Sequence, residues 1–503
     1  MSVQSDLGDL KARLREARDI STSAAVLYWD QSTYMPAGGA AGRGRQLAVL
    51  SRLAHESATD PEIGRLLDRL ATYAESLPPE HDDAALIRVA RHDYERVTRV
   101  PAEYSERAAK HASATYAAWV EARPKNDFAT MRPMLETTLD LSREYAEFFP
   151  GYEHIADPLI DDADEGMTVA RIRPVFDELR AGLTPLVARI AAAEQVDDGP
   201  VRKHFPQAQQ SRFAEKVIRS IGFDYERGRL DPTAHPFMTR FGHGDTRITT
   251  RTNEDFLAEQ LFSTIHEAGH ALYEQGTRAE DDGLPLGSGT SASVHESQSR
   301  LWENIVGRSL GFWSHWYPVL QEEFPEQLGN AGLRDFYAAV NRVEPSLIRT
   351  DADEVTYNLH VMIRFDLELQ LLEGELAVAD LPEAWHAHYQ SDLGVRAPDD
   401  RDGVLQDVHW YAGSIGGAFQ CYTLGNIIGA QLYEAALRDL PDIPRQIASG
   451  DTSSLLEWMT TNVYRVGRRL TPDQLIDRVC GGPLDAQPLL RRLTAKFEDL
   501  YAL

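Results

Sequence analysis

The chain has 503 residues, of which 43% are hydrophobic and 26% are charged, and this composition excludes a wholly disordered protein. Its formal net charge of −27 disfavours nucleic acids and anionic membrane surfaces as partners, because both repel an acidic protein. The two cysteines, Cys421 and Cys480, are far apart in the sequence, which argues against a disulfide scaffold and indicates a reducing compartment.

The organisation of the chain is indicated by its hydrophobic period. Residues 1–19 alternate charged and apolar residues without the apolar core of a signal peptide, and no later stretch approaches membrane-spanning length, so we expect a cytoplasmic protein. Apolar residues recur at three- and four-residue spacing almost throughout. Neither a repeat nor a low-complexity linker divides the chain. We therefore predict a mainly α-helical fold that forms one large unit, a single domain of residues 1–503.

One segment departs from the helical period. In residues 235–252 (HPFMTRFGHGDTRITTRT), Thr246, Ile248 and Thr250 alternate with the polar residues at positions 247, 249 and 251. This alternation predicts a short strand or hairpin. Such a strand can pair with an extended ligand backbone, although a plain surface hairpin fits the pattern equally well.

The next segment, residues 253–276, is predicted as a helix that Asn253 caps and Gly276 ends. His266 and His270 are four residues apart, so they project from one face and can bind one metal ion at about 2 Å. Glu267 can take a proton from water that the metal activates and deliver it to a leaving amine. This H-E-x-x-H pattern indicates a catalytic zinc-type site and a metallopeptidase; a polar helix face without chemistry is the alternative.

A catalytic metal site also needs a third protein ligand and one open position. Glu274 lies about 12 Å along the helix axis from His266, which is too far for one ion to reach both. The metzincin pattern requires a third histidine six residues after His270, where this chain has Gly276. The third ligand must therefore come from another segment.

The best source of that ligand is a second predicted helix that begins near residue 293. Glu296 is the preferred candidate, and its neighbour His295 competes with it. Glu303 lies two turns further on. It is either a hydrogen-bond acceptor for a ligand imidazole or a solvated charge.

Further motifs occur along most of the chain. In order they are residues 28–31 (YWDQ) with 35–36 (MP), 235–237 (HPF), 245–249 (D-x-R-x-T), 266–270 (H-E-x-x-H), 295–298 (HESQ), 348–353 (I-R-x-x-A-D) and 403–410 (G-x-x-Q-D-x-H-W). Together they resemble the M32 family of metallocarboxypeptidases, the Taq-type thermostable carboxypeptidases.

The resemblance implies a metal bound by His266, His270 and Glu296, with Glu267 as general base in the release of single C-terminal amino acids from peptides. Zinc is expected as the one divalent metal per chain, although two histidines and a carboxylate also accept cobalt or manganese. The resemblance further implies a gluzincin-like, almost entirely helical fold with a deep groove, a small sheet beside the metal, and a homodimer.

Release of C-terminal residues requires recognition of a free carboxylate, for which a planar guanidinium is well suited. Arg349 is predicted to serve this purpose. An ion pair of Arg349 with Asp351 or Asp353 is the structural alternative. An endopeptidase or oligopeptidase with the same metal chemistry would lack such a receptor. A catalytically impaired relative is a second alternative, which the intact Glu267 opposes.

A donor for the oxyanion is expected from residues 403–422. His409 and Tyr422 are the candidates, and Asp407 is expected to orient His409. Relatives typically have the sequence F-G-Y-F-P-T-Y in the segment that ends at Tyr422 in this chain. One tyrosine of that family sequence is here Ala418. Tyr411 is a possible substitute for that tyrosine.

Two residues of the predicted hairpin segment, residues 235–252, complete the predicted site. His235 and Arg247 are candidates for holding the substrate backbone. The alternative is that an interaction between Asp245 and Arg247 only orders the hairpin. Trp410 is predicted to belong to the core rather than to contact substrate.

Overall fold

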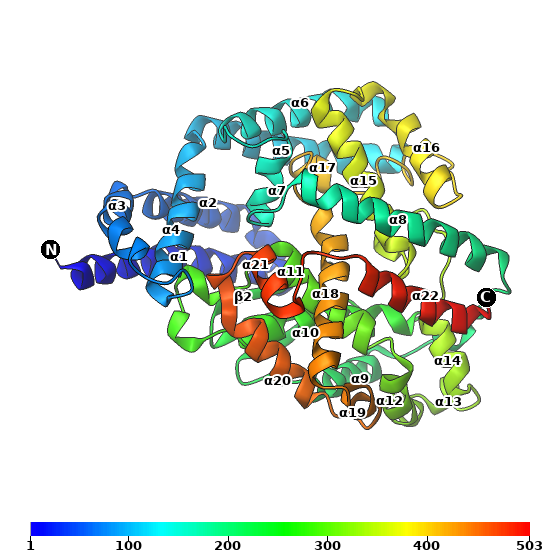
Figure 1. Ribbon diagram of the computed structural model, residues 1–503. Helices are drawn as coiled ribbons and strands as arrows, with labels where there is room; N and C mark the ends of the chain where they lie inside the picture. The colour runs from blue at the N-terminus through cyan, green and yellow to red at the C-terminus, as the bar shows by residue number, and fades with distance from the viewer. Residues whose placement is uncertain (1) are drawn as a thin grey trace.

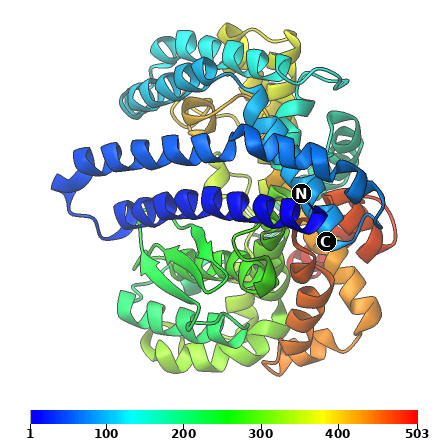
Figure 2. The same ribbon diagram turned by 90° about the vertical axis from the view of Figure 1, so that its left-hand side faces the viewer.

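The computed structural model describes residues 2–503 and is mainly α-helical (Figure 1). Four helices begin the chain: α1 (Val3–Thr33), α2 (Ala40–Ala58), α3 (Pro61–Glu75) and α4 (Asp82–Arg99). Helices α1 and α2 lie side by side as a long hairpin that extends to one side of the body (Figure 2). A small apolar core joins the first part of α1 to α3 and α4, with Leu10, Leu67 and Val89 at its centre.

The remaining helices enclose the main apolar core. Helix α15 is buried along almost its whole length and is apolar on several faces, as expected for a helix in the middle of a large protein. Helix α18 runs through the middle of the molecule beside it (Figure 1). The helices around the main apolar core are α5 (Ala102–Ala122), α6 (Phe128–Glu147), α7 (Asp157–Ala163), α8 (Val169–Ala192), α9 (Gln207–Ser220), α12 (Leu310–Glu323), α13 (Pro325–Leu328), α14 (Leu333–Val340), α15 (Thr356–Glu373), α16 (Leu381–Asp392), α17 (His409–Ala412), α18 (Gln420–Asp439), α19 (Ile443–Ala448), α20 (Ser453–Asn462), α21 (Pro472–Cys480) and α22 (Gln487–Tyr501).

A small sheet has three strands in the order β1-β3-β2: β1 (Gly228–Pro232), β2 (Met238–Gly242) and β3 (Asp245–Thr250). Strands β2 and β3 form the predicted hairpin. Strand β1, which was not predicted, pairs in parallel with β3. Since β3 is the central strand, its backbone is paired on both sides. Within the predicted segment only β2 is an edge strand, so an extended ligand could pair with β2 but not with β3, and substrate pairing at this edge stays a prediction.

Two helices carry the predicted metal ligands: α10 (Leu257–Gln275) and α11 (Ala292–Arg300). Helix α10 ends at Gly276 as predicted, but it begins at Leu257, and Asn253 does not cap it. Instead the Asn253 side chain accepts a hydrogen bond from the backbone of Asp255, which closes a turn before the helix. Helix α11 is capped by Ser291 and continues into a π-helical turn, residues 301–306.

A close approach joins α10 and α11 at Gly269. A Cβ atom at this position would lie 2.7 Å from the carbonyl oxygen of Gln298 and 2.7 Å from the Cα of Ser299. Any larger side chain would push the helices apart. The glycine inside H-E-A-G-H therefore allows two ligands on α10 to face the third ligand on α11.

A cavity of about 760 Å³ lies between the N-terminal helices α4 and α7 and the segment from Ser288 to Ala292. It reaches Glu274 and His295, which lie behind the predicted ligand His270. None of the three predicted ligands lines this cavity, so it lies behind His270 and not over the metal position, and the deep groove that the resemblance implies stays a prediction. Across residues 2–503, none of the helices combines the length and apolar character that crossing a membrane requires. The single-domain assignment stays a prediction.

Candidate metal centre

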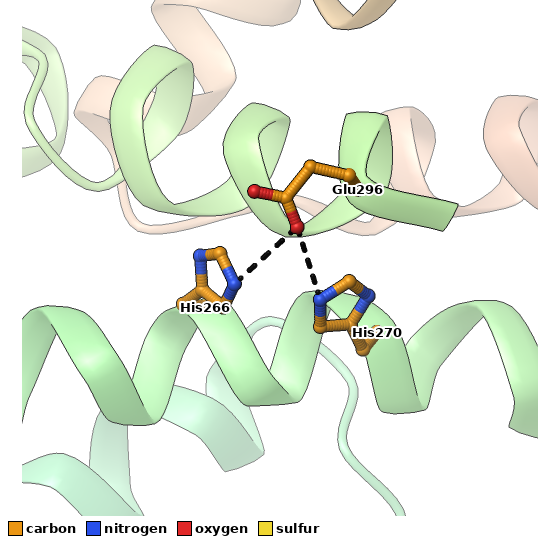
Figure 3. Close-up of side chains that lie close together, drawn as sticks. All are labelled: His266, His270 and Glu296. Atoms are coloured by element: carbon orange, nitrogen blue, oxygen red, sulfur yellow. Dashed lines mark ion pairs between the residues drawn. The ribbon is translucent and has the colours of Figure 1, made fainter. Parts of the chain in front are cut away.

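The three predicted ligands meet at one point between α10 and α11. His266 and His270 project from α10 toward one carboxylate oxygen of Glu296 on α11 (Figure 3). That oxygen lies 3.6 Å from Nε2 of His266 and 3.3 Å from Nε2 of His270. Helical geometry alone predicted that His266 and His270 share one face. The structure brings the third predicted ligand, Glu296, to this face from a helix about 30 residues further along.

The donor set fits a small divalent cation. Ligand atoms at about 2.05 Å from an ion in tetrahedral geometry are about 3.3 Å from one another. The two distances to Glu296 match this value, and the three ligand atoms all lie within 4.8 Å of one another. Two imidazoles and one carboxylate leave a fourth position for water or substrate, as in catalytic zinc sites.

The electrostatics of the ligands also suit a cation. Burial opposes ionisation of Glu296, but the charges of Arg300 and His266 outweigh it and hold the pKa of that carboxyl well below its usual range. Burial lowers the pKa of His270 to about 4. Glu296 is therefore charged and His270 neutral at pH 7, which are the forms that bind metal. Although burial opposes it, Glu296 and Glu303 raise the pKa of His266, so a metal ion must displace a proton there.

The general-base candidate Glu267 directly follows His266 on α10 and is buried. Burial raises the pKa of its carboxyl to about 7 in the metal-free protein, although the neighbouring His266 opposes the shift. Proton transfer at neutral pH is most effective for a group whose pKa lies near the working pH. The raised pKa is compatible with the general-base role of Glu267, which stays a prediction.

Each imidazole is supported at its second ring nitrogen. Nδ1 of His266 lies 2.9 Å from the carboxylate of Glu303, in the π-helical turn after α11. This is the contact predicted as one of the two roles of Glu303, and it fixes the ring so that Nε2 faces the metal position. Nδ1 of His270 lies 2.6 Å from Nδ1 of His295. His295, the competing ligand candidate, therefore lies behind His270 rather than beside Glu296.

Arg300 is a further residue of the site, which the sequence reasoning missed. Its Nε donates to Glu296 at 2.7 Å, and its Nη1 lies 3.3 Å from Glu303. One guanidinium therefore holds both the ligand carboxylate and the carboxylate that supports His266. The signal was present in the sequence, because residues four apart on a helix are neighbours and Arg300 follows Glu296 at this spacing.

A second cluster surrounds the predicted carboxylate receptor. Arg349 is buried, and its Nε lies 2.6 Å from Asp407. Neither Asp351 nor Asp353 is its partner: Asp353 instead accepts hydrogen bonds from the backbone at the start of α15. The predicted alternative thus named the right interaction and the wrong aspartate. Asp407 also accepts from Nε of Arg364 at 3.0 Å.

Asp407 orients His409 as predicted, since Nδ1 of His409 lies 2.5 Å from the carboxylate. Although burial opposes it, hydrogen bonding to His409 and the charges of the two arginines keep the pKa of Asp407 far below its usual range. Nε2 of His409 lies 3.0 Å from the hydroxyl of Tyr422. The structure therefore brings both oxyanion candidates into one hydrogen-bonded chain.

The second cluster adjoins the metal centre. The ring of Tyr357 contacts the guanidinium of Arg300 at 4.4 Å, and its hydroxyl accepts from Nη1 of Arg349 at 3.0 Å. Tyr411 is buried, and its hydroxyl donates to the carbonyl of Val404 at 3.0 Å and not to this cluster. It does not replace the tyrosine that is absent at Ala418.

The hairpin candidates lie further out. His235 is exposed in the bend between β1 and β2. Arg247 on β3 makes two hydrogen bonds to Asp245, at 2.9 and 2.8 Å, so the predicted interaction that orders the hairpin is present. Its guanidinium also lies 4.3 Å from the ring of Trp29 on α1. Trp410 is buried and donates to Glu368 at 2.7 Å, as its assignment to the core predicts.

Gly425 on α18 is the second close approach that shapes the site. A Cβ atom there would lie 2.5 Å from Cγ of Glu296 and 2.8 Å from its Cβ.

We expect Gly425→Ala to displace Glu296, to cost about 1–3 kcal/mol of stability and to weaken metal binding. Competition with a chromophoric chelator measures this affinity. Gly429→Ala is the matched control, because its Cβ meets α11 at the carbonyl of Ser297, 3.0 Å away, and not Glu296. Equal metal affinities in the two variants would contradict the prediction.

A helical fold with a His-His-Glu centre of this geometry defines a metal-dependent hydrolase of the H-E-x-x-H type. The family model described as carboxypeptidase Taq (M32) metallopeptidase matches residues 9–497. The chain belongs to this family and is a metallocarboxypeptidase. Thermostable carboxypeptidase 1 of Thermus thermophilus is 43% identical over 497 residues, which are 97% of each chain. Carboxypeptidase 1 of Bacillus subtilis is 35% identical over 492 residues, also 97% of each chain.

The comparison of folds leads to the same family. The crystal structure of an M32 carboxypeptidase from Deinococcus radiodurans R1 superposes with a TM-score of 0.96 at 50% sequence identity, and covers 99% of this chain and 100% of the other. The predicted mainly helical fold with a small sheet is confirmed.

Proposed function

We propose that this metallocarboxypeptidase removes single amino acids from the C-terminus of peptides, with His266, His270 and Glu296 as the metal ligands and Glu267 as the general base. The observation that carries the proposal is the convergence of the three ligand atoms within 4.8 Å of one another beside the buried carboxyl of Glu267. Zinc is the proposed metal, because two imidazoles and a carboxylate form a common catalytic zinc site.

A divalent cation held by these three residues supplies a Lewis acid that polarises the scissile carbonyl and acidifies water. Glu267 accepts the proton of the attacking water and then delivers it to the leaving amine. Glu303 keeps Nε2 of His266 directed at the metal position by holding Nδ1 at 2.9 Å. Arg300 keeps the carboxylate of Glu296 in place from the opposite side.

Arg349 has donors left for a substrate carboxylate. A guanidinium has five N–H groups. Asp407 takes those of Nε and one of Nη2, at 2.6 and 3.4 Å, and Tyr357 takes one of Nη1. One N–H remains on each terminal nitrogen, and a terminal carboxylate can accept hydrogen bonds from these two donors. Burial of Arg349 strengthens this interaction because water does not compete well there.

His409 and Tyr422 are proposed as the oxyanion donor. The proton on Nδ1 of His409 is directed to Asp407 and the hydroxyl of Tyr422 lies at Nε2. The hydroxyl of Tyr422 is the donor proposed to face the developing negative charge, and His409, held by Asp407, positions that hydroxyl. Burial raises the pKa of Tyr422, so the hydroxyl keeps its proton at neutral pH.

The test is to follow peptide mass over time with the zinc-loaded protein, using one sequence with a free and with an amidated C-terminus. We expect stepwise loss of single C-terminal residues from the free peptide and no reaction of the amide. Internal cleavage, or equal cleavage of both peptides, would favour the oligopeptidase alternative over this proposal. Four expectations from the sequence stay predictions: the homodimer, the cytoplasmic location, the absence of nucleic-acid and membrane partners, and the roles of His235 and Arg247.

A further inference from the structure

A chain of buried polar groups continues from the second nitrogen of His270 into the sheet. Nδ1 of His270 lies 2.6 Å from Nδ1 of His295, and Nε2 of His295 lies 3.0 Å from the carboxylate of Glu274. The other oxygen of Glu274 pairs with Arg240 at 3.1 Å. Arg240 is on β2, so the chain links the strand to the metal position.

The number of protons fixes the direction of this chain. An imidazole that binds metal through Nε2 carries its proton on Nδ1 and donates it. Nδ1 of His295 must then be the acceptor, which leaves Nε2 of His295 to donate to Glu274. Each imidazole thus donates once, and the chain ends on a carboxylate. Protonation of both facing nitrogens would place two donors 2.6 Å apart, which the short contact excludes.

Glu274 is held for this role. It is 4% exposed, accepts from the backbone of Gly289 at 3.1 Å, and pairs with an arginine that is itself buried. Arg240 also donates to the carbonyl of Gly287 and lies 3.3 Å from Asp282. A carboxylate so deep in a protein is costly unless it is paired and hydrogen-bonded, and here it is both.

We propose that Glu274, supported by Arg240, is a positioning residue for the metal centre: through His295 it fixes the tautomer and orientation of His270 and increases the basicity of that ligand. Glu274 lies too far along α10 to bind the metal itself, so it acts two hydrogen bonds away. The two ligand imidazoles are therefore supported differently, His266 by a carboxylate directly and His270 by a carboxylate through a second imidazole. The proposal rests on the ligand set of the proposed function.

The experiment measures metal affinity rather than activity. Glu274→Gln keeps the size of the side chain and removes its charge. We expect a fall in Zn²⁺ affinity of roughly 10- to 100-fold in competition with a chromophoric chelator. The visible absorption of the Co²⁺-loaded protein should change as well, because a weaker donor alters the ligand field at the ion. A role in stability alone would leave that spectrum unchanged.

Two further variants make the test decisive. Asp282→Asn is the matched control, since it removes the other carboxylate partner of Arg240 without touching the chain to His270, and we expect unchanged Zn²⁺ affinity. Should Glu274→Gln fail to fold because Arg240 loses its buried partner and keeps only the more exposed Asp282, the double variant Arg240→Met with Glu274→Gln removes both charges. It should fold and show the same loss of affinity.

Wild-type affinity and an unchanged Co²⁺ spectrum in Glu274→Gln, or in the double variant, would overturn the positioning role. An equal loss in Asp282→Asn would do the same, because the effect would then come from the loop and not from the chain to His270. Failure of the proposed ligand set has a different result: the wild-type protein itself would bind no Zn²⁺, or His270→Ala would bind it as tightly as the wild type.

Discussion

Replacing Glu267 by glutamine is expected to lower kcat by about 100- to 10,000-fold, the range that general acid–base catalysis contributes. Glutamine keeps the size and burial of the side chain but cannot accept a proton from water. Since Glu267 is not one of the three convergent ligand residues, Zn²⁺ affinity should stay near that of the wild type. The first quantity is measured by release of the C-terminal amino acid and the second by chelator competition.

Glu259→Gln is the matched control for this variant. Glu259 lies on the same helix and pairs with Arg251 near the surface, so its replacement changes the charge of α10 and leaves the site alone. Unchanged kcat in Glu267→Gln would contradict the mechanism. A loss of kcat accompanied by loss of Zn²⁺ would assign Glu267 to metal binding instead. Wild-type peptide cleavage by Glu259→Gln shows that the charge of the helix is not the cause.

The parts of the site that the sequence predicted best are those set by local geometry. The spacing of His266 and His270 fixes their common face wherever the helix lies, so this pair needed no tertiary information. Glu296 and His295 are neighbours on the same helix start, and residue pattern alone left them as competitors. The packing of α11 against α10 decides between them, since Glu296 faces both imidazoles while His295 faces the far side of His270.

The parts that sequence did not predict depend on contacts between distant segments. Arg349 pairs with Asp407, 58 residues away, whereas a search for nearby partners finds Asp351 and Asp353. Strand β1 contains Pro232 and lacks alternation, so nothing in its residues indicates that it pairs with β3. The role of Gly425 appears only when α18 meets Glu296, because a glycine in a helix has no sequence signal for what approaches it.

The fold class was predicted correctly because it rests on period. Apolar residues at helical spacing over most of 503 residues permit few architectures other than packed helices. Helix boundaries were less certain. Asn253, Glu254 and Asp255 are all favourable at a helix start, yet Asn253 uses its side chain in a turn and α10 begins at Leu257.

Replacing Arg349 by alanine is expected to lower kcat/KM for peptides with a free C-terminus by roughly 30- to 5,000-fold. This range corresponds to the loss of about 2–5 kcal/mol for truncating one partner of a buried, hydrogen-bonded charge pair. The loss should fall mainly on KM, because a carboxylate remote from the reacting bond is bound equally in the ground and transition states. Steady-state kinetics on free and amidated forms of one peptide measure it.

The shared aspartate makes the division between KM and kcat the decisive quantity. Asp407 holds both Arg349 and His409, so loss of the arginine can also disturb the proposed oxyanion donor. If Arg349 binds the carboxylate, Arg349→Lys should recover part of the affinity, since it restores the charge without the fork, and kcat should change little. If Arg349 acts only through Asp407, kcat should fall in both variants while KM stays constant. The second pattern would remove the carboxylate receptor from this mechanism and leave Arg349 as a residue that orders His409.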